Sequence, residues 1–508
     1  MCVIDPNNCG DQLPIPEVIA VKIAVLTLGT RGDVQPFVQI ADSLIGQGHE
    51  VTFASPPGMS SLTKALPVST VEFGPDVSAF LNSPRGQRII LSGRTSTLLR
   101  ELFLLNNKHS EEIDDVFREL SAGADLLIGG SLAEEKAAAA ALAHSIPMTS
   151  VHFSPFVKTS LVPHSLFDIG NLGPYTNRRT YDLFTALRSI AALRDTARIP
   201  EVPFSQRISH RIIERAGATV VDAYSRHLLP STESIGDPDS SSRLDPTGFI
   251  HMTPHLRSRV FRSVSEADSE GIEQWIASGS GEVVYFGFGS MPVGDPTRLL
   301  ALIAEVCRAL GTRAVWCTGW SPTHTIPVDS RIRVVDEVDH DRIIPLCVTV
   351  VHHGGAGTTA MALRHGRPQV ITSFFWDQQF WGRMVANKNL GIHLRYRTAR
   401  AEDLMIAIRY AMSPPVRIRA ELLARAAAVE GGLGNTLSKI DAAVRISAVS
   451  TRPDSNFLVD TAAAQNCPRH VPQFPDTRAD EGPSSHPSSC RAGDVLDAAN
   501  DRQESDIR

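Results

Sequence analysis

The chain has 508 residues, too many for one compact hydrophobic core, so we expect two domains with additional segments. A hydrophobic fraction of 42% is ordinary for a globular protein, and a net charge of −6 gives no reason to expect nucleic acid as a partner. No apolar run reaches the roughly 18 residues that a transmembrane helix needs, and the first twenty residues carry no Lys or Arg, which argues against a signal peptide.

The first half of the chain alternates apolar strands with amphipathic helices. After an expected disordered leader at 1–20, residues 21–28 form an apolar run typical of a buried parallel strand. The polar loop Gly29–Asp33 separates this run from residues 37–44, whose apolar side chains recur at helical spacing, and a second strand opens at 51–53. This is a βαβ unit, and we expect it to begin a parallel sheet.

The same pattern recurs at 126–130, which places residues 21–229 in one N-terminal domain. Residues 230–247 are rich in Ser, Asp and Pro, as interdomain linkers are. A further series of four apolar strands follows and predicts a C-terminal domain over 248–429. We expect both domains to be α/β and doubly wound, with ligands at the carboxyl ends of the strands.

Two segments close the chain. We expect a helix at 430–450 to cross back onto the N-terminal domain. Residues 451–508 hold six basic and ten acidic side chains, a net charge of −4, among many Ser and Pro residues. That composition predicts a disordered tail.

The seven cysteines are scattered, without a CxxC pair, and no N-x-[ST] glycosylation acceptor occurs. This favours reduced thiols in a cytoplasmic protein over a disulfide framework or a zinc site. We therefore expect no metal site.

A glycine-rich stretch, His352–Thr358, follows the apolar run 347–351 and precedes a helical pattern. A buried strand that breaks into glycines and then starts a helix can grip phosphate, because backbone N–H groups approach the anion and the helix N-terminus contributes roughly half a positive charge. Asp377 and Gln378 follow, a carboxylate beside an amide, which suits sugar hydroxyls. Together these features indicate a nucleotide sugar.

The earlier loop, Gly29–Asp33, lacks the spacing of a dinucleotide-binding fingerprint. Its Arg-Gly-Asp tripeptide resembles an adhesion motif, but a loop after a buried strand argues against that role. Asp33 precedes Val34, with Pro36 in the first turn, so it can be a helix N-cap. It can equally be a catalytic carboxylate, and the residues alone leave both roles open.

Other residues near these loops are also ambiguous. The run His353–Gly355 resembles the oxyanion loop of lipases, but no G-x-S-x-G elbow occurs in the chain, which leaves a hydrolase little support. His352 and His353 can instead cap strand-end carbonyls. Ser290 follows a strand, where its hydroxyl can meet a phosphate or simply complete a turn. The aromatic residues around Asp377 form either core or a carbohydrate surface: Phe374, Phe375, Trp376, Phe380 and Trp381.

Four segments, in order, resemble the family 1 glycosyltransferases of GT-B fold, and within them the sterol 3-beta-glucosyltransferase-like branch of fungi and bacteria. The resemblance extends over about residues 21–447. The four segments are Gly29–Pro36, Gly287–Met291, His352–Thr358 and Phe374–Gln378 with Phe380–Gly382.

The resemblance implies two Rossmann-like domains that face each other across a cleft. It also implies an inverting, metal-independent reaction without a cofactor. In that reaction glucose, or a close hexose, moves from a UDP-sugar to a hydroxyl of a lipophilic acceptor, such as a sterol or a specialised metabolite. The product would be a β-glycoside.

The resemblance also implies roles for single residues. Asp33 would be the catalytic base that takes the acceptor proton, supported by Thr30, Arg31 and Gly32. The first domain would form the acceptor pocket, with Phe153 and Phe156. The nucleotide and its phosphates would be held by Ser290, Trp320, His353, Gly355, Ala356, Gly357 and Thr358. The sugar would be held by Asp377 and Gln378, with Trp376 in support.

The chain departs from the family pattern in places. Many relatives have Gly where Trp376 stands, which predicts a reshaped sugar pocket. The family's His-Asp-Trp is His340–Arg342 here, and its tryptophan near 156 is Phe156. The membrane-binding modules of large fungal sterol enzymes are missing from this sequence, so we expect at most transient contact with a membrane surface.

Two other functions fit the same fold. One is a nucleotide-sugar epimerase, which acts on UDP-GlcNAc without an acceptor. The other is a non-catalytic lipid-binding relative, against which the intact Asp33, Asp377 and Gln378 argue. In the favoured interpretation Asp33 and the glycine loop belong to opposite domains, so we expect the site to form only when the domains close.

Overall fold

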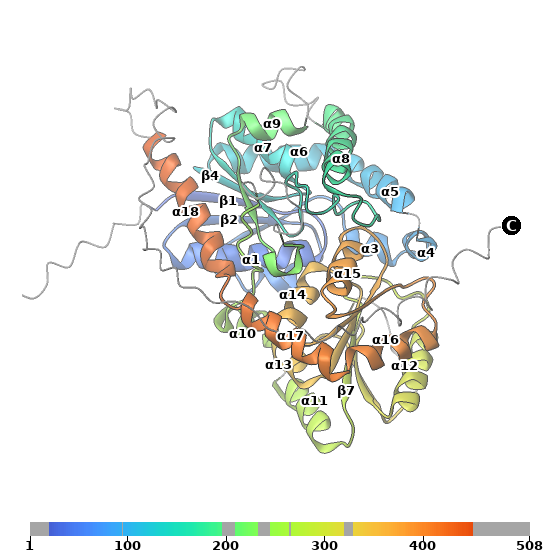
Figure 1. The fold of residues 1–508 in the computed structure, drawn as a ribbon. Coiled ribbons are helices and arrows are strands. Elements are labelled where there is room, and N and C mark those ends of the chain that lie inside the picture. Colours follow the sequence, from blue (N-terminus) through green and yellow to red (C-terminus); the bar gives the residue numbers. More distant parts are fainter. Residues whose placement is uncertain are drawn as a thin grey trace, which may run out of the picture. The chain divides into compact units, whose positions relative to one another are not determined.

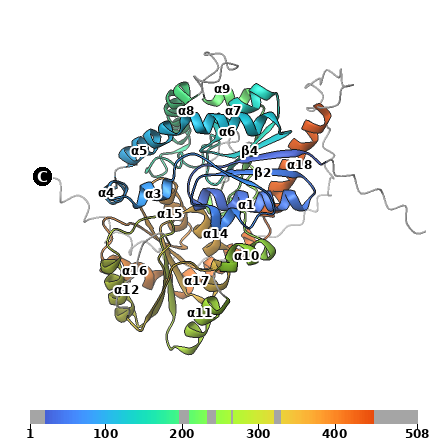
Figure 2. The same ribbon diagram turned by 180° about the vertical axis from the view of Figure 1, so that it is seen from behind.

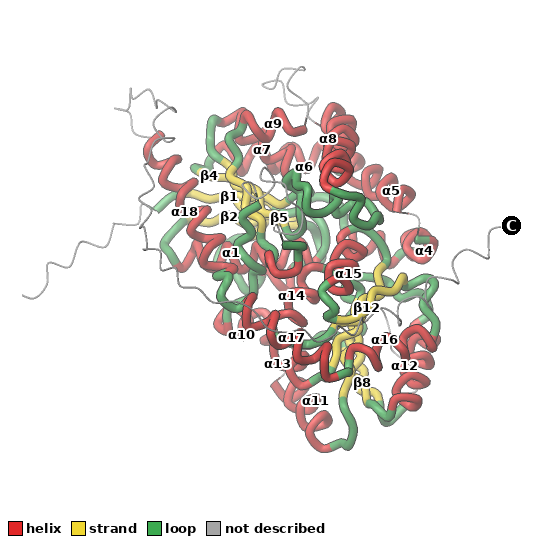
Figure 3. The backbone as a smooth tube through the Cα atoms, viewed as in Figure 1, coloured by secondary structure: helices red, strands yellow, loops and turns green. Residues whose placement is uncertain are grey.

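The computed structural model describes residues 20–93, 95–195, 209–231, 244–263, 266–319 and 329–450. These residues form two six-stranded parallel sheets with helices packed against them (Figures 1 and 3). Several predicted features lie outside the described residues: the leader up to residue 19, the tail from residue 451, linker residues 232–243, and Trp320.

The first sheet has the strand order β3-β2-β1-β4-β5-β6, and every neighbouring pair is parallel. Its strands are β1 (Lys22–Leu26), β2 (Glu50–Ser55), β3 (Thr70–Glu72), β4 (Leu126–Gly130), β5 (Met148–His152) and β6 (Thr219–Asp222). The central strands β1, β4 and β5 are almost entirely buried, as their continuous apolar runs predict, whereas the edge strand β3 is not.

The second sheet has the order β12-β11-β10-β7-β8-β9 and is also parallel throughout. Its strands are β7 (Val283–Gly287), β8 (Arg313–Cys317), β9 (Ile332–Val335), β10 (Thr349–His352), β11 (Gln369–Ser373) and β12 (Gly391–Arg395). Counted within each sheet, both orders are 3-2-1-4-5-6, which confirms the doubly wound prediction. The order reverses between β1 and β4 in one sheet and between β7 and β10 in the other, and ligands bind at such switch points.

Helices connect the strands of both sheets. In the first half they are α1 (Arg31–Gly46), α2 (Ser60–Thr63), α3 (Val77–Asn82), α4 (Pro84–Ser92), α5 (Thr95–Lys108), α6 (Ser110–Ala122), α7 (Glu134–His144), α8 (Pro174–Asp195), α9 (Ser209–Arg215) and the short helix Arg226–Leu228. In the second half they are α10 (Pro254–Val260), α11 (Glu266–Ser278), α12 (Pro296–Leu310), α13 (His340–Ile343), α14 (Ala356–Arg364), α15 (Asp377–Asn387), α16 (Ala401–Ala411), α17 (Pro414–Ala427), α18 (Gly432–Ser450) and the short helices Phe261–Ser263 and Ile344–Leu346.

Local chemistry explains where α12 begins and ends. Asp295 accepts hydrogen bonds from the backbone N–H groups of Thr297 and Arg298, and Pro296 opens the helix. Gly311 ends it in the left-handed conformation that glycine favours. The apolar side of α12 is buried, and the helix packs against α16 (Figure 2).

The helix at the end of the described chain returns to the first sheet. α18 contacts α1, β4, β5 and β6, and its Ile440 joins the same hydrophobic cluster as Val25 of β1 (Figure 1). Leu256 of α10 belongs to this cluster as well, although residues from 248 onward were assigned to the second domain. The domain boundaries therefore stay predictions. Of the helices described, none is both long and apolar enough to cross a membrane.

Candidate active site

The first candidate residue, Asp33, lies in the first turn of α1. Gly29, with φ +113°, turns the chain directly after β1, so the helix starts at Arg31 with Thr30 as its N-cap. Asp33 is the third helical residue, and its Oδ2 accepts hydrogen bonds from the Thr30 backbone N–H (2.8 Å) and hydroxyl (3.1 Å). The expectation that Asp33 itself is the N-cap is therefore wrong, because the helix begins earlier. Asp33 instead closes a capping box from inside the helix.

The carboxylate of Asp33 lies against the backbone of Gly29. A Cβ at Gly29 would be 2.4 Å from Asp33 Oδ2, so only glycine leaves room for this arrangement. The carboxylate is half-buried. Burial raises its pKa, although the hydrogen bonds from Thr30 act in the opposite direction. A raised pKa makes a carboxylate a stronger general base near neutral pH.

Three glycine turns meet at the carboxyl edge of the second sheet, after β7, β8 and β10. A Cβ at Gly319 would lie 2.2 Å from Gly289 O. A Cβ at Gly289 would lie 2.9 Å from His353 Cε1, and one at Gly355 would lie 2.5 Å from His353 Nε2. The His353 ring thus packs between Gly289 and Gly355. We call Gly289, Gly319, His353 and Gly355 the glycine cradle.

The cradle opens onto the N-terminus of α14. Gly355 is the N-cap of this helix, and no side chain caps its first turn. The N–H groups near Ala356, Gly357 and Thr358 are therefore available to an anion, in the geometry that phosphate prefers. Ser290 is half-buried in the turn after β7, at the same edge.

The two adjacent histidines differ. His352 Nδ1 accepts the Gly354 N–H (3.2 Å), and its Nε2 bonds to Gln369 Oε1 (3.0 Å). Burial lowers the pKa of His352 to about 3 and that of His353 to about 4, so both are neutral at neutral pH. His352 holds the turn, whereas Nδ1 of His353 is buried without a hydrogen-bond partner. Positive potential for a phosphate therefore comes from α14 rather than from these imidazoles.

The predicted sugar-binding residues, Asp377 and Gln378, lie at the start of α15. Gln378 Oε1 accepts hydrogen bonds from the backbone N–H groups of Phe374 (2.9 Å) and Phe375 (3.4 Å), which leaves only its NH2 group for a sugar. Trp376 is the N-cap, with φ +54° and ψ −134°, a conformation that favours glycine and strains a tryptophan. Its indole Nε1 is buried without a partner.

The charge of Asp33, in the first half of the chain, affects the pKa of Asp377 in the second half. Burial, and then the negative charge of Asp33, raise the pKa of Asp377 to about 7. The two carboxylates, one from α1 and one from α15, therefore share one electrostatic environment. This is the strongest link between the predicted catalytic residue and the predicted sugar site.

Arg31 also reaches the second half of the chain. It pairs with Glu337, which follows β9, and stacks on the Phe261 ring at 5.9 Å. Burial, and then the charge of Arg31, lower the pKa of His340 to about 4. Of the three predicted supporting residues, Thr30 orients Asp33, Arg31 contacts the other half, and Gly32 is exposed.

The predicted acceptor residues lie in the first half. Phe153 packs edge-on against Phe37, with 5.6 Å between the ring centroids. Phe156 contacts His152, His164 and Phe184, the last at 5.6 Å. Both phenylalanines are half-buried.

Leu132 and Glu337 are not among the residues predicted from the sequence. Leu132 follows β4 and touches the same glycine as Asp33, since a Cβ at Gly29 would lie 2.9 Å from Leu132 Cδ1. The sequence holds one usable signal for it, a position just after a buried strand, as for Asp33. Glu337 is identified only by its long-range pairing with Arg31.

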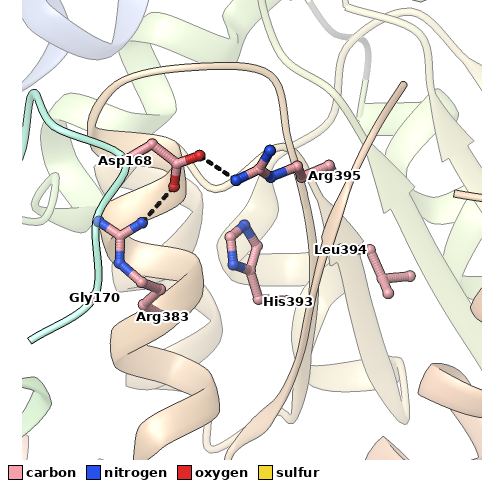
Figure 4. Close-up of a pocket in the computed structure, with 6 residues that line it drawn as sticks. All are labelled: Asp168, Gly170, Arg383, His393, Leu394 and Arg395. Carbon is pink, nitrogen blue, oxygen red and sulfur yellow. Dashed lines mark hydrogen bonds and ion pairs between the residues drawn. The ribbon is translucent and has the colours of Figure 1, made fainter. Parts of the chain in front are cut away.

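A cavity of about 300 Å³ lies beside α15 and β12 (Figure 4). In it Asp168 accepts hydrogen bonds from Arg383 (2.6 Å) and Arg395 (2.5 Å). One carboxylate from the first half of the chain thus pairs with both cations, so this group of three keeps one net positive charge. The contact joins the loop after β5 to the helix that carries Asp377.

Comparison with known families identifies two segments. Residues 23–110 match the N-terminal domain of glycosyltransferase family 28, and residues 319–431 match the C-terminal domain of erythromycin biosynthesis protein CIII-like proteins. The first segment contains Asp33, and the second contains the glycine loop and Asp377.

Similar proteins are known along most of the chain. An uncharacterized protein of Mycobacterium bovis is 30% identical over 408 residues, which cover 78% of this chain and 91% of that protein. An uncharacterized glycosyltransferase of Mycobacterium leprae is 28% identical over 428 residues, 84% of this chain and 95% of the relative. A sterol 3-beta-glucosyltransferase of Arabidopsis thaliana is 28% identical over 447 residues, 84% of this chain and 66% of the plant protein.

Solved structures share the fold at low sequence identity. The calicheamicin glycosyltransferase CalG4 superposes with a TM-score of 0.57 at 13% identity, over 84% of this chain and 99% of that one. The glycosyltransferase VinC, solved with dTDP, superposes with a TM-score of 0.52 at 17% identity, over 84% and 100%. The two-domain fold expected from the sequence is thereby confirmed.

Proposed function

The chain belongs to the glycosyltransferases of GT-B fold, and from that premise we propose that it moves glucose, or a close hexose, from a UDP-sugar to a hydroxyl group of a lipophilic acceptor. The product is a β-glycoside, and the acceptor is a sterol or a specialised metabolite. Membership of family 1, a cytoplasmic location and transient contact with a membrane surface are parts of the same proposal.

One observation carries the proposal: the electrostatic coupling of Asp33 to Asp377. The charge of Asp33 contributes to raising the pKa of Asp377, which supports a site in which the carboxylates of α1 and α15 lie near each other. An acceptor hydroxyl at Asp33 and a sugar at Asp377 are then adjacent, as direct transfer requires.

The mechanism follows from these positions. Asp33 removes the proton from the acceptor hydroxyl while that oxygen attacks the anomeric carbon of the sugar. The bond between this carbon and the phosphate oxygen breaks, and UDP leaves with the bonding electrons. The uncapped N–H groups of α14 and its dipole stabilise the added negative charge, so the mechanism needs no metal ion. Attack from the face opposite the phosphate inverts an α-linked donor into a β-glycoside.

The choice of glucose and of a lipophilic acceptor has separate support. The plant relatives are named sterol 3-beta-glucosyltransferases, and their similarity extends over both halves of this chain. Exposed Leu132 beside Asp33 is consistent with an apolar acceptor.

The test is to incubate the full chain with UDP-glucose and a panel of lipophilic alcohols in EDTA, and to identify products by mass spectrometry. We expect a product that carries one added hexose, and UDP in equal amount. Conversion of UDP-GlcNAc without an acceptor would identify an epimerase instead. Acceptor binding without any product would identify a lipid-binding protein, and dependence on added metal would contradict the mechanism.

A further inference from the structure

An exposed leucine lies beside the proposed base. β4 and β1 flank the switch point of the first sheet, and the loop after each strand reaches the same glycine. A Cβ at Gly29 would meet Asp33 Oδ2 at 2.4 Å and Leu132 Cδ1 at 2.9 Å. The Leu132 side chain is 47% exposed, unlike the buried Ala133 that follows it. An apolar surface therefore adjoins the carboxylate at the place where ligands of this fold bind.

Arg188 of α8 contacts the residues on both sides of Leu132. Arg188 Nη2 donates to the carbonyl of Ser131 (3.0 Å), and Nη1 donates to Glu134 Oε2 (3.2 Å). The same guanidinium also pairs with Glu135. Arg188 thus contacts the turn after β4 at Ser131 and the first two residues of α7, on either side of Leu132 and Ala133.

The anchor for Arg188 is a buried ionic group. Glu134 Oε1 accepts hydrogen bonds from Ser150 Oγ (2.7 Å) and His152 Nε2 (2.9 Å). Burial alone would raise the pKa of Glu134, but His152 and Arg188 hold it at about 2. Glu134 is therefore ionised over the working pH range, and a buried carboxylate with these partners is costly to displace.

The same helix connects this anchor to the predicted acceptor residue. The Arg188 guanidinium lies over the Phe184 ring at 5.5 Å, and Phe184 packs against Phe156 at 5.6 Å. α8 thereby contacts the Leu132 loop and Phe156 at once. Movement of α8 would shift both apolar groups together.

We propose that Leu132 is an acceptor-binding residue beside Asp33 and that Arg188 is its positioning residue. This deepens the proposed function and rests on it. The acceptor class that fits is an alcohol whose hydroxyl is flanked by hydrocarbon, such as an alicyclic alcohol, rather than a sugar hydroxyl with polar neighbours. A polar neighbour placed against Leu132 would lose its water without gaining a hydrogen bond.

The test compares KM values for acceptor and donor in Leu132→Ala, Leu132→Met and the control Leu422→Ala, which changes a leucine exposed to a similar degree on α17. We expect Leu132→Ala to raise the acceptor KM roughly tenfold, without a change in the UDP-glucose KM. Leu132→Met should stay near wild type, as should the control. An acceptor KM in Leu132→Ala equal to that of the control would overturn the proposal.

Arg188 is tested with Arg188→Lys and Arg188→Gln against Arg179→Gln, an exposed arginine of the same helix. A positioning role predicts a higher acceptor KM in both Arg188 variants, smaller for lysine, with an unchanged donor KM. A rise in both KM values together would contradict that role. If Arg188→Gln does not fold, the acceptor and donor KM values of Arg188→Lys alone test the positioning role.

A wild-type chain that forms no product with any acceptor would refute the proposed function, and a binding measurement then decides the inference. Radiolabelled cholesterol in detergent is the probe, with Leu132→Ala and Leu422→Ala compared directly. Weaker binding in Leu132→Ala alone supports the role of Leu132. Equal binding in the two variants overturns it.

Discussion

The carboxyl edges of the two sheets share one strand order but are built differently. At the second edge, three glycine turns and His353 touch so closely that no Cβ fits at Gly289, Gly319 or Gly355. At the first edge Gly29 is confined in this way, and near it lie exposed Leu132 and half-buried Phe153. The glycine cradle at the second edge presents backbone N–H groups at the start of α14, whereas the surface around Asp33 at the first edge is made of side chains.

This difference fits the two proposed functions of the edges, which are donor binding at the second and acceptor binding at the first. A diphosphate is the same in every donor, so a fixed backbone cradle suits it. Acceptors vary in shape, so a surface of apolar side chains suits them. Substitutions at the second edge should therefore damage binding through steric conflict. Those at the first edge should alter chemistry or selectivity and leave nucleotide binding unchanged.

The largest expected effect is that of Asp33→Asn. We expect kcat to fall by about 10²- to 10⁴-fold, because the amide cannot accept the acceptor proton. The Kd of UDP should stay the same, because the cradle is untouched, and calorimetry measures it. Asp115→Asn, at an exposed position on α6, is the control. An unchanged kcat in Asp33→Asn would remove Asp33 from the mechanism.

The second-largest effect is expected at Gly319. It is measured against Gly311, a glycine with a similar backbone conformation. A Cβ added at Gly319 (φ +59°) would lie 2.2 Å from Gly289 O, whereas one added at Gly311 (φ +68°) would have no atom within 4 Å beyond its own neighbours in the chain. Gly319→Ala should lower the free energy of unfolding by about 1–3 kcal/mol more than Gly311→Ala, because the extra methyl must displace backbone. It should also weaken UDP binding. Thermal unfolding and calorimetry measure both, and equal behaviour of the two variants would refute a tight cradle.

The pH dependence of donor binding tests the coupling between the two edges. With a pKa of about 7, Asp377 loses its charge as the pH falls through neutrality, so UDP-glucose should bind more weakly below pH 7 while UDP itself changes less. Asp33→Asn removes a neighbouring negative charge and should move this midpoint to lower pH. A midpoint that stays in place in Asp33→Asn would show that the carboxylates do not interact.

The same pKa shift has a consequence for stability. The pKa of Asp377 is higher in the folded chain than in the unfolded one, so its stabilising contribution is present at low pH and is lost as the pH rises through about 7. Asp377→Asn should therefore melt with less pH dependence than the wild type between mildly acidic and mildly basic pH. Thermal unfolding at several pH values measures this.

The smallest expected effect concerns Asp168, which joins the two halves through Arg383 and Arg395. These pairs are partly exposed, so Asp168→Asn should lower the free energy of unfolding by less than about 1 kcal/mol, and less still in high salt. Asp182→Asn removes an exposed pair within the first half and is the control. A large loss confined to Asp168→Asn would contradict the small contribution expected of these partly exposed pairs.

The sequence predicted the periodic parts of the fold well. Both sheets, the helix after Gly29 and the helix after Gly355 follow from apolar runs and glycines, since burial and chain reversal leave strong local patterns. The N-cap was one of two roles left open for Asp33, and the structure gives that role to Thr30, because the chain turns at Gly29 and the helix begins at Arg31. The sequence predicted which segments are helices and which are strands, but not the residue at which the helix α1 begins.

Contacts between distant segments could not be predicted. The network of Arg188, Glu134 and His152 joins residues with no shared sequence pattern, and the pairing of Arg31 with Glu337 depends on tertiary packing. The same holds for Gln378, whose oxygen holds the turn at Phe374. A local motif identifies these residue types but not their partners.

The most direct test of the central claim measures UDP release from UDP-glucose by the full chain with and without a lipophilic alcohol, alongside Asp33→Asn saturated with the same donor. We expect the wild type to release UDP only when the acceptor is present, and the variant to release almost none although it binds UDP normally. Equal release with and without the acceptor, or from the variant, would contradict it.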